Sequence, residues 1–389
     1  MIIVSSIIYF CLIFIVIQSY FLYPLIIYVL SKKAYEQNSN APDYTTPVSI
    51  LISVYNEEVT IEKTIRQILK SKYDMNKIEI IIGSDKSEDQ TNEIINKLSS
   101  EFPNIKFFPF LIRRGKSAVL NDLVENANNE ILIFMDANSY IHTDAIGYLV
   151  RHYVSDKIGG VCGRLILVDD QSKRGAGYEE ENYWKIESGL KKFEGDLGIV
   201  IGANGGIYSI RKKLFQKIPT DYPVMDDFYI SMKILEQGKK MIYEKKAVAE
   251  ENITASIGIE FKRKIRNNAI MMSTLRVLKN LLNPSYGIIA FAFWSHKVIR
   301  WFSPVILLLI FIINLLLFNV SILFKIIFFL QIIHLLLSVI GFFMRTKFYY
   351  PKILAMPFYF TLTNFALMIG LFKFIRKTQT SFWQSTPRK

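Results

Sequence analysis

Acidic side chains follow three apolar runs of the sequence, near the point where each run ends. Short and almost continuous apolar runs are typical of strands buried on both faces, as in parallel sheets. Ligands on such sheets bind at the carboxyl ends of the strands, where carboxylates can hold a cation or accept hydrogen bonds. Taken singly, each acid could instead cap a helix, but three at one edge favour a functional site. The runs and their acids are 48–54 with Glu57, 78–82 with Asp85, and 131–135 with Asp136.

Between these runs the apolar residues recur with helical spacing. Strands that alternate with helices of this length are typical of βαβ units and a parallel sheet. Region 46–283 is therefore predicted to be an α/β domain with a mostly parallel, Rossmann-like sheet. The helical apolar positions are Ile61, Ile65, Ile68 and Leu69 after the first run, and Ile94, Ile95 and Leu98 after the second.

The composition separates this chain from several classes of protein. It has 389 residues, of which 51% are hydrophobic and 21% are charged, with a net charge of +13. This excludes a disordered chain, a coiled coil and an ordinary cytosolic enzyme. Two cysteines exclude a disulfide scaffold or a Cys-rich zinc module, and four histidines with no i,i+4 pair leave little for a His-based metal site. The positive charge suits nucleic acid, anionic lipid or a phosphorylated substrate.

The N-terminal segment is predicted to be a transmembrane helix over residues 1–31. Residues 1–30 contain no Asp, Glu, Lys or Arg, and about 20 apolar residues suffice to cross a bilayer. The segment lacks the basic start and small-residue cleavage site of a cleaved signal peptide. Lys32 and Lys33 follow it, so the positive-inside rule places the next domain in the cytoplasm and the N-terminus outside.

A second apolar region predicts three further transmembrane helices within residues 302–375. The stretch 302–343 fits two spans with a turn near 319–321, and a last span follows a basic loop at 345–352. Four spans would place the C-terminus outside, which conflicts with the basic residues of the tail. These basic residues are Arg376, Lys377, Arg388 and Lys389.

Residues 284–301 mix aromatic side chains with His296, Lys297 and Arg300. This composition is typical of an amphipathic helix that lies in the headgroup plane of a membrane. The alternative is that the segment is the start of the next span. Because the basic residues of the chain cluster beside the membrane rather than with exposed aromatics, nucleic acid is not an expected partner.

A set of motifs follows in order along the α/β region. They are 48–57 ending in Tyr55-Asn-Glu57, Ser84-Asp85 with Ser87, Asp89 and Thr91, Arg114-Gly-Lys116 with Leu120-Asn121, Asp136-Ala-Asn138, Tyr183-Trp184 with Glu187, Gly202-Ala-Asn-Gly-Gly-Ile-Tyr208, Asp226-Asp227 and Arg263-Lys-Ile-Arg266. Each motif alone is weak, and the specificity comes from their order and spacing. Together they resemble membrane-bound family 2 glycosyltransferases of the GT-A fold, in the superfamily of cellulose and hyaluronan synthases. The resemblance covers nearly the whole of region 46–283, and the flanking spans also match.

The resemblance implies a UDP-sugar donor and a divalent metal, Mg²⁺ or Mn²⁺. When the bond to the diphosphate breaks, the leaving group gains negative charge, which a cation neutralises. Asp136 matches the metal ligand of the family. Asn138 stands where the family usually has a second acid, and its amide oxygen would be an uncharged ligand. As an alternative, Asp136 could cap a helix.

The same resemblance assigns residues to the donor. Asp85 matches the aspartate that accepts hydrogen bonds from the uracil, and Glu57 stands where the family contacts the ribose or the base. Lys116, with Arg114 nearby, is expected to meet the phosphates of the donor or the base. The alternative interpretation of Lys116 is a solvated residue on a helix.

Asp227 matches the catalytic base of the family, and Asp226 its acidic neighbour. A base must take the proton of the acceptor hydroxyl as it attacks, and repulsion between adjacent carboxylates could raise one pKa. In-line attack would invert the anomeric centre. Alternatively, the pair could be an acidic helix start favoured by the helix dipole.

A basic segment before the second apolar region contains Arg263 and Arg266, which could bind diphosphate. Polymer-forming members of the family usually carry Trp where this chain has Asn267, which argues against processive synthesis. The segment could instead anchor the domain to anionic lipid. Trp184 could supply acceptor stacking from elsewhere, or belong to the core.

These observations predict a multi-pass cell-membrane glycosyltransferase with its active site at the cytoplasmic face. It would transfer a sugar from a UDP-sugar to a lipid-linked or polysaccharide acceptor in cell-surface glycan synthesis. A processive polysaccharide synthase is the second enzyme hypothesis. A non-catalytic membrane subunit that binds nucleotide sugars is the hypothesis from another class. A transporter is disfavoured, because four spans show no hydropathy repeat.

Overall fold

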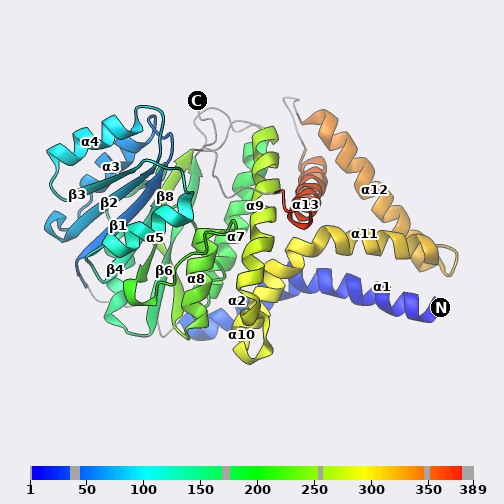
Figure 1. Cartoon of the computed structure of the whole chain (residues 1–389). Helices are drawn as coiled ribbons and strands as arrows, with labels where there is room; N and C mark the ends of the chain where they lie inside the picture. The colour runs from blue at the N-terminus through cyan, green and yellow to red at the C-terminus, as the bar shows by residue number, and fades with distance from the viewer. Residues whose placement is uncertain (1, 36–43, 169–175, 253–256, 346–350, 379–389) are drawn as a thin grey trace.

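The computed structural model describes residues 2–35, 44–168, 176–252, 257–345 and 351–378. An α/β domain built on one sheet lies beside a group of long apolar helices (Figure 1). The greater part of the predicted basic loop, the tail with Arg388 and Lys389, and the side chain of Tyr183 fall outside the described residues.

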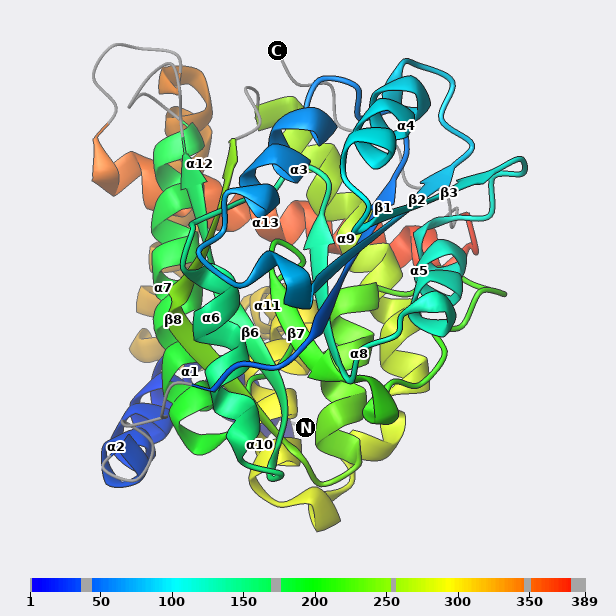
Figure 2. The ribbon, with the colours of Figure 1, turned by 90° about the vertical axis from the view of Figure 1, so that its left-hand side faces the viewer.

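The sheet has eight strands in the order β3-β2-β1-β4-β7-β6-β8-β5. Its first half is parallel, with β1 between β2 and β4, and β3 at the edge. Beyond β4, strand β7 is antiparallel to both neighbours, while β6 and β8 run parallel to each other. In Figure 2 the sheet domain is nearest the viewer, with the long helices behind it. The bounds are β1 Val48–Val54, β2 Ile78–Asp85, β3 Ile105–Phe110, β4 Ile131–Asp136, β5 Tyr140–Ile141, β6 Ile158–Val168, β7 Tyr208–Arg211 and β8 Lys240–Asn252.

The three apolar runs are strands β1, β2 and β4, which confirms the prediction of a mostly parallel α/β domain. Their side chains alternate between two cores, one on each face of the sheet. Leu51 belongs to one core, whereas Ile50 and Ile52 belong to the other. All three side chains are fully buried, and each such side chain contributes about 1.5–3 kcal/mol.

Helices cover both faces of the sheet. Helices α3, α4 and α6 pack on the face of Ile50, while α5, α8 and parts of α7 and α9 pack on the face of Leu51. The bounds are α3 Ile61–Leu69, α4 Thr91–Glu101, α5 Lys116–Asn126, α6 Ala145–Val150, α7 Ala176–Leu197, α8 Asp226–Glu236 and α9 Ile257–Val277, with short 3-10 turns at Met75–Lys77, Arg151–Val154, Lys212–Leu214, Lys279–Leu282 and Pro284–Tyr286.

Four helical segments of the described chain are long and apolar enough to cross a membrane: Ile2–Lys33, Ile288–Leu317, Ile322–Met344 and Lys352–Ile375. This number agrees with the four predicted spans. Helices α1 and α11 lie side by side, and α13 packs between α9 and α12 (Figure 1). The elements are α1 Ile2–Ile17, η1 Gln18–Leu22, α2 Tyr23–Tyr35, α10 Ile288–Phe293, η7 Trp294–Val298, α11 Ile299–Leu317, α12 Ile322–Met344 and α13 Lys352–Ile375.

Two of these segments contain a π-helical turn, η1 in the first and η7 in the second. The two turns contact each other, because Gln18 Nε2 donates to Ser295 Oγ at 2.7 Å and Ser19 Oγ donates to the Ser295 carbonyl at 2.6 Å. Helix α10 continues through η7 into α11 without a break. Most of the segment 284–301 is therefore continuous with the second candidate span, and its position relative to a bilayer stays a prediction.

Candidate active site

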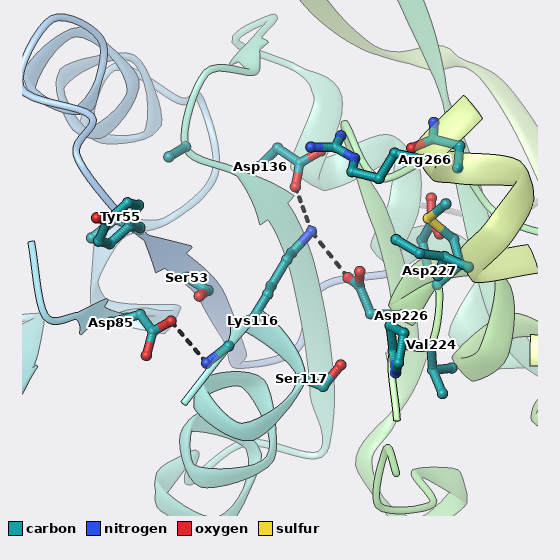
Figure 3. A pocket seen from close by; sticks show the side chains of 18 of the residues that line it. Ser53, Tyr55, Asp85, Lys116, Ser117, Asp136, Val224, Asp226, Asp227 and Arg266 are labelled. Carbon is teal, nitrogen blue, oxygen red and sulfur yellow. Dashed lines mark hydrogen bonds and ion pairs between the residues drawn. The ribbon is translucent and has the colours of Figure 1, made fainter. Parts of the chain in front are cut away.

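A pocket opens at the carboxyl ends of the parallel strands (Figure 3). Because β1, β2 and β4 end at the same edge, the residues that follow them are brought together although they lie far apart in the sequence. Every residue that the sequence assigned to a site lines this pocket: Glu57, Asp85, Arg114, Lys116, Asp136, Asn138, Asp226, Asp227, Arg263 and Arg266.

Asp85, the last residue of β2, is held by backbone groups at the start of α5. Its Oδ1 accepts the N–H of Arg114 at 2.7 Å and its Oδ2 accepts the N–H of Gly115 at 2.9 Å. Gly115 has a φ of +88°, which favours glycine at this turn. Each carboxylate oxygen keeps lone-pair capacity for one further donor. The side chain is therefore rigid and can still accept hydrogen bonds from a ligand.

Glu57 and Arg114 are oriented by neighbours as well. The Glu57 Oε2 accepts from Thr60 Oγ1 at 2.8 Å, and the side chain is almost fully buried. The guanidinium of Arg114 bonds to Asp122 Oδ2 at 2.5 Å. At the Asp85 end of the pocket, Arg114 therefore contributes its backbone N–H, while its guanidinium pairs with a carboxylate on α5. A contact of Arg114 with the phosphates or the base of a donor stays a prediction.

Lys116 lies between two aspartates. Its Nζ is 2.7 Å from Asp136 Oδ1 and 3.0 Å from Asp226 Oδ2 (Figure 3). Burial alone would lower the pKa of Lys116, but the carboxylates of Asp136 and Asp226 outweigh this and raise it. The alternative interpretation of Lys116 as a solvated helix residue does not agree with this geometry.

Asp227 lies one residue further along α8, which begins at Asp226. Its Oδ1 accepts the backbone N–H of Phe228 at 2.7 Å, so the pair also forms the acidic helix start that the sequence allowed. Burial, followed by the adjacent charge of Asp226, raises the pKa of Asp227 to about 7. Repulsion between neighbours is thus present, as predicted, but burial is the larger cause.

Gly205 lies close to the carboxylates of both Asp136 and Asp227. A Cβ at Gly205 would lie 2.8 Å from Asp136 Oδ2 and 3.4 Å from Asp227 Oδ2. The two carboxylates therefore face a common space that a side chain at this position would enter. Sequence reasoning named the glycine-containing motif 202–208 without a role for Gly205, and only the geometry gives it one.

The aspartate cluster (Asp136, Asp226 and Asp227) has an excess of negative charge over the ammonium of Lys116. Carboxylates with an unmatched charge fit a hard cation such as Mg²⁺ or Mn²⁺. Among the described residues, no group of three or more His, Cys, Asp or Glu side chains could hold a metal alone. A cation at Asp136 and Asn138 would therefore need oxygens from a ligand.

The far wall of the pocket comes from α9. Arg263 and Arg266 line the pocket together with Asn267. Burial and the neighbouring Arg263 lower the pKa of Arg266, but arginine stays charged in proteins. Two adjacent guanidinium groups at a partly buried wall favour an anionic ligand with more than one charge.

Trp184 and Glu251 line the same pocket beside Gly206. Trp184 also packs against the core, and its stacking on an acceptor stays a prediction. Glu251 was missed by sequence reasoning, since it follows no motif. Its Oε1 accepts from Ser139 Oγ at 2.6 Å, so the pocket has a further carboxylate that the sequence did not indicate.

The family model "Glycosyl transferase family 2" matches residues 49–218. The poly-beta-1,6-N-acetyl-D-glucosamine synthase of Staphylococcus aureus (strain COL) is 27% identical over 223 residues, which are 56% of this chain and 53% of the relative. The probable glycosyltransferase YdaM of Bacillus subtilis (strain 168) is 24% identical over 282 residues, 69% of this chain and 66% of YdaM. The chain thus spans about half the length of the synthases that it matches.

A solved structure has a similar fold over almost the whole chain. It is the mannosyltransferase PcManGT from Pyrobaculum calidifontis, in complex with GDP-Man and Mn²⁺. The match has a TM-score of 0.69 and 17% sequence identity, and covers 96% of this chain and 100% of the mannosyltransferase. At this identity the match supports the GT-A fold of the sheet domain together with its helices.

Proposed function

We propose that the chain is a member of glycosyl transferase family 2, whose model matches residues 49–218, and that it transfers a sugar from a UDP-sugar to a glycan or lipid-linked acceptor. The observation that carries the proposal is that the carboxylates of Asp136 and Asp227 line one pocket and both lie within 3.4 Å of the point that a Cβ at Gly205 would occupy. One carboxylate can serve the leaving group while the other serves the attacking hydroxyl.

The donor would lie along the parallel half of the sheet. Asp85 offers remaining acceptor capacity to the N–H groups of a base, and Glu57 lies beside it in the pocket. Lys116, Arg263 and Arg266 supply positive charge for a diphosphate. A pocket with acceptors at one end and cations in the middle suits a nucleoside diphosphate sugar.

Asp136 and Asn138 would hold Mg²⁺ or Mn²⁺ together with phosphate oxygens. When bound, the metal neutralises charge on the leaving diphosphate. Lys116, which bridges Asp136 and Asp226 at 2.7 and 3.0 Å, keeps the carboxylates in place and adds a second positive charge on the same side.

Asp227 would take the proton from the acceptor hydroxyl. A pKa raised to about 7 suits a group that accepts a proton near neutral pH. Attack on the face of the sugar opposite the diphosphate inverts the anomeric centre, so an α-linked donor would give a β-linked product. Trp184 and Glu251, near Asp227 in the pocket, offer a flat ring and a carboxylate to an acceptor sugar.

Four helices that are long and apolar enough to cross a membrane would attach this domain to a bilayer. The basic residues Lys32 and Lys33, at the end of the first helix, support a cytoplasmic position of the sheet domain. An amphiphilic or exported acceptor would explain why a transferase of this kind is attached to a bilayer.

The test is a panel of nucleotide sugars offered to the purified full chain in detergent. UDP-N-acetylglucosamine, UDP-glucose, UDP-galactose and GDP-mannose are compared, each with Mn²⁺, with Mg²⁺ and with EDTA. We expect metal-dependent UDP release with one UDP-sugar and none from the Asp227→Asn variant. Release of GDP alone would correct the donor, and no release from any donor would favour the non-catalytic subunit.

A processive polysaccharide synthase is a second candidate, favoured by the match to a synthase whose name specifies a polymer. Asn267 lines the pocket where a tryptophan platform would be expected of a polymer-forming member, so we propose one or a few transfers per acceptor. The length of the products distinguishes the two candidates. Long chains formed when only a little donor has been consumed require processive synthesis, whereas short products indicate one or a few transfers per acceptor.

A further inference from the structure

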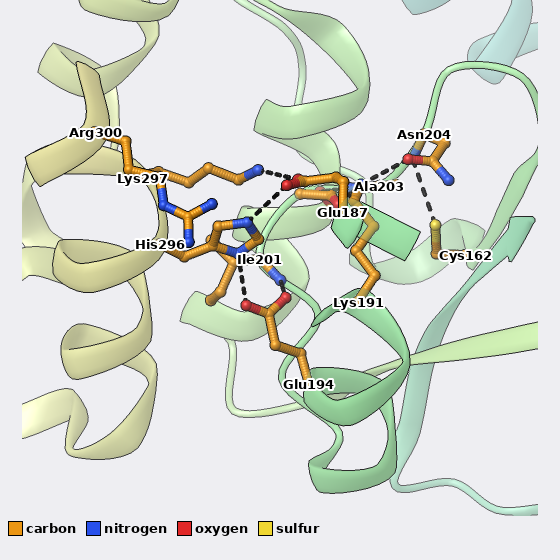
Figure 4. Close-up of polar contacts among 12 residues, drawn as sticks. Cys162, Glu187, Lys191, Glu194, Ile201, Ala203, Asn204, His296, Lys297 and Arg300 are labelled. Atoms are coloured by element: carbon orange, nitrogen blue, oxygen red, sulfur yellow. Dashed lines mark hydrogen bonds and ion pairs between the residues drawn. The ribbon is translucent and has the colours of Figure 1, made fainter. Parts of the chain in front are cut away.

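A buried cluster of charged side chains joins the membrane helices to α7 (Figure 4). At its centre His296, from the π-helical turn η7, bonds through Nδ1 to Glu194 Oε1 at 2.6 Å and through Nε2 to Glu187 Oε2 at 3.0 Å. The His296 side chain is fully buried, and Glu187 and Glu194 are nearly so. This cluster lies outside the pocket and has no role in the chemistry proposed above.

The cluster ties three elements together. Each ring nitrogen of His296 is within hydrogen-bond distance of a carboxylate oxygen, so the ring bridges Glu194 and Glu187 on α7. Lys297 pairs with Glu187, and Tyr23 of α2 donates to Glu194 Oε1 at 2.6 Å. Elements α2, η7 and α7 are thereby held in one arrangement by bonds that water does not screen.

From α7 the bonds continue to the loop that precedes β7. The second oxygen of Glu194 accepts the backbone N–H of Ile201 at 3.0 Å. Lys191 donates to the carbonyl of Gly202 and to Asn204 Oδ1, both at 2.6 Å. Residues 201–204 are thus fixed by α7 side chains, one of which is held by His296.

The loop then reaches the aspartates of the pocket. The N–H of Ala203 donates to Ser231 Oγ at 2.9 Å, and Ser231 Oγ donates to the carbonyl of Asp227 at 2.7 Å. Two residues after Ala203 comes Gly205, where a Cβ would lie 2.8 Å from Asp136 Oδ2 and 3.4 Å from Asp227 Oδ2. A shift of residues 201–205 would therefore change the space between these two carboxylates.

We propose that His296 is a positioning residue for sugar transfer: held between Glu187 and Glu194, it fixes loop 201–206 and so the separation of Asp136 and Asp227. The inference rests on the proposed function, since it names what sets the geometry of that site. The proposal also gives a role to the contact of η1 with η7. Because His296 belongs to η7, the packing of η7 against η1 helps to determine the position of His296.

The chain supplies a matched control. On another part of the sheet domain His152 bonds to Glu244 Oε2 at 2.8 Å, and Arg151 pairs with the same carboxylate. This second cluster also joins a histidine to a nearly buried glutamate. None of its residues lines the pocket or contacts loop 201–206 through the hydrogen bonds described.

The first measurement does not need a donor. Backbone hydrogen exchange is compared between the wild-type chain, His296→Leu, His296→Gln and His152→Leu in detergent. We expect peptides that contain Ile201 and Ala203 to exchange at least about tenfold faster in His296→Leu, less so in His296→Gln, and unchanged in His152→Leu. Lys191→Met, which removes the next link, should reproduce the effect if His296→Leu does not fold.

The second measurement uses the UDP-sugar found active in the donor panel. We expect the kcat of His296→Leu to fall about 10- to 100-fold with KM for donor and the affinity for Mn²⁺–UDP unchanged, and His296→Gln to retain more activity. Equal losses in His296→Leu and His152→Leu, or unchanged exchange of residues 201–206, would refute the positioning role. A wild-type chain inactive with every donor would instead refute the proposed function, while the exchange result would still decide the inference.

Discussion

The two ends of the pocket hold their carboxylates in different ways. Asp85 accepts two backbone N–H groups, at 2.7 and 2.9 Å, which stabilise its charge by hydrogen bonding. Asp136 and Asp226 instead share the ammonium of Lys116, and Asp227 lies beside them with a pKa raised to about 7. The first end thus uses backbone hydrogen bonds, whereas the aspartate cluster uses a charged side chain and is the proposed position of a metal ion.

This difference separates recognition from chemistry. A carboxylate that is fixed by backbone N–H groups presents the same acceptor atoms to every ligand. These hydrogen bonds also offset the free energy of burying its charge. Carboxylates crowded in a buried space store unfavourable energy, which a metal ion or a proton relieves. On the proposed function, we therefore expect the Asp85 end, which would bind the donor, to tolerate small changes, and the aspartate cluster, where transfer would occur, to depend on each charge.

The largest expected effect comes from removing the charge of Asp136. In Asp136→Asn the shape of the side chain is kept, but the proposed metal ligand loses its charge, so transfer should fall by at least about 10³-fold. Metal-dependent UDP release measures this, with UDP affinity in EDTA as the control. An Asp136→Asn variant that keeps metal-dependent turnover would place the metal elsewhere.

Asp227→Asn should lower kcat by about 10²–10⁴-fold, because the hydroxyl of the acceptor loses its base. The affinity for Mn²⁺–UDP should stay within a factor of two to three of wild type, since Asp227 lies on the side away from the proposed nucleotide. Rate and calorimetric titration measure the two quantities. If turnover stays near wild type, Asp227 has no part in the mechanism.

Asp85→Asn sharpens the comparison at the other end. The amide NH₂ would face one of the backbone N–H groups of Arg114 and Gly115 and leave it unsatisfied, which costs about 1–3 kcal/mol. We expect KM for the donor to rise about tenfold with a smaller change in kcat. A fall in kcat as large as that of Asp227→Asn would contradict the separation of the two ends.

Glu244 gives the smallest effect on transfer, because it lies outside the pocket. Burial would raise its pKa, but hydrogen bonds from His152 and Arg151 outweigh this and lower it to about 2. The unfolded value is about 4.3, so the stabilisation is present above that pH and is lost as pH falls towards 2.

Glu244→Gln should therefore lower the free energy of unfolding at neutral pH by about 2 kcal/mol and flatten the loss of stability below pH 5. Thermal unfolding in detergent across the pH range measures both. Transfer per folded molecule should stay at the wild-type level. A loss of kcat without a loss of folded protein would mean that the cluster around Glu244 also affects the geometry of the aspartate cluster.

Local patterns predicted the parts of the fold that are local in sequence. The apolar runs ending before Glu57, Asp85 and Asp136 were sufficient to predict the strands and the edge at which the acids meet. The guanidinium of Arg114 could not be placed in this way, since its partner Asp122 competes with any phosphate. The position of a motif in the sequence predicts where its backbone lies in the fold. The direction of a side chain depends in addition on the residues that surround it in space.

Contacts between residues that lie far apart in the sequence could not be predicted, for a different reason. His296 and Glu187 are 109 positions apart, and Ser139 and Glu251 are 112 apart. No spacing rule links residues at such separations, because their contact depends on how whole helices and strands pack. The histidine was noted only as part of an amphipathic segment, and its buried position follows from the π-helical turn.

The core on one face of the sheet is completed by helices assigned to the membrane. Phe228, the neighbour of Asp227, packs with ring centroids 5.8 Å from Phe293 and 5.6 Å from Trp301, and Tyr23 and Ile27 belong to the same core. A fragment trimmed at the helix boundaries would therefore be left with an exposed hydrophobic surface behind Asp227. We expect such a fragment to aggregate, so crystallisation and assays call for the full chain with these helices in place.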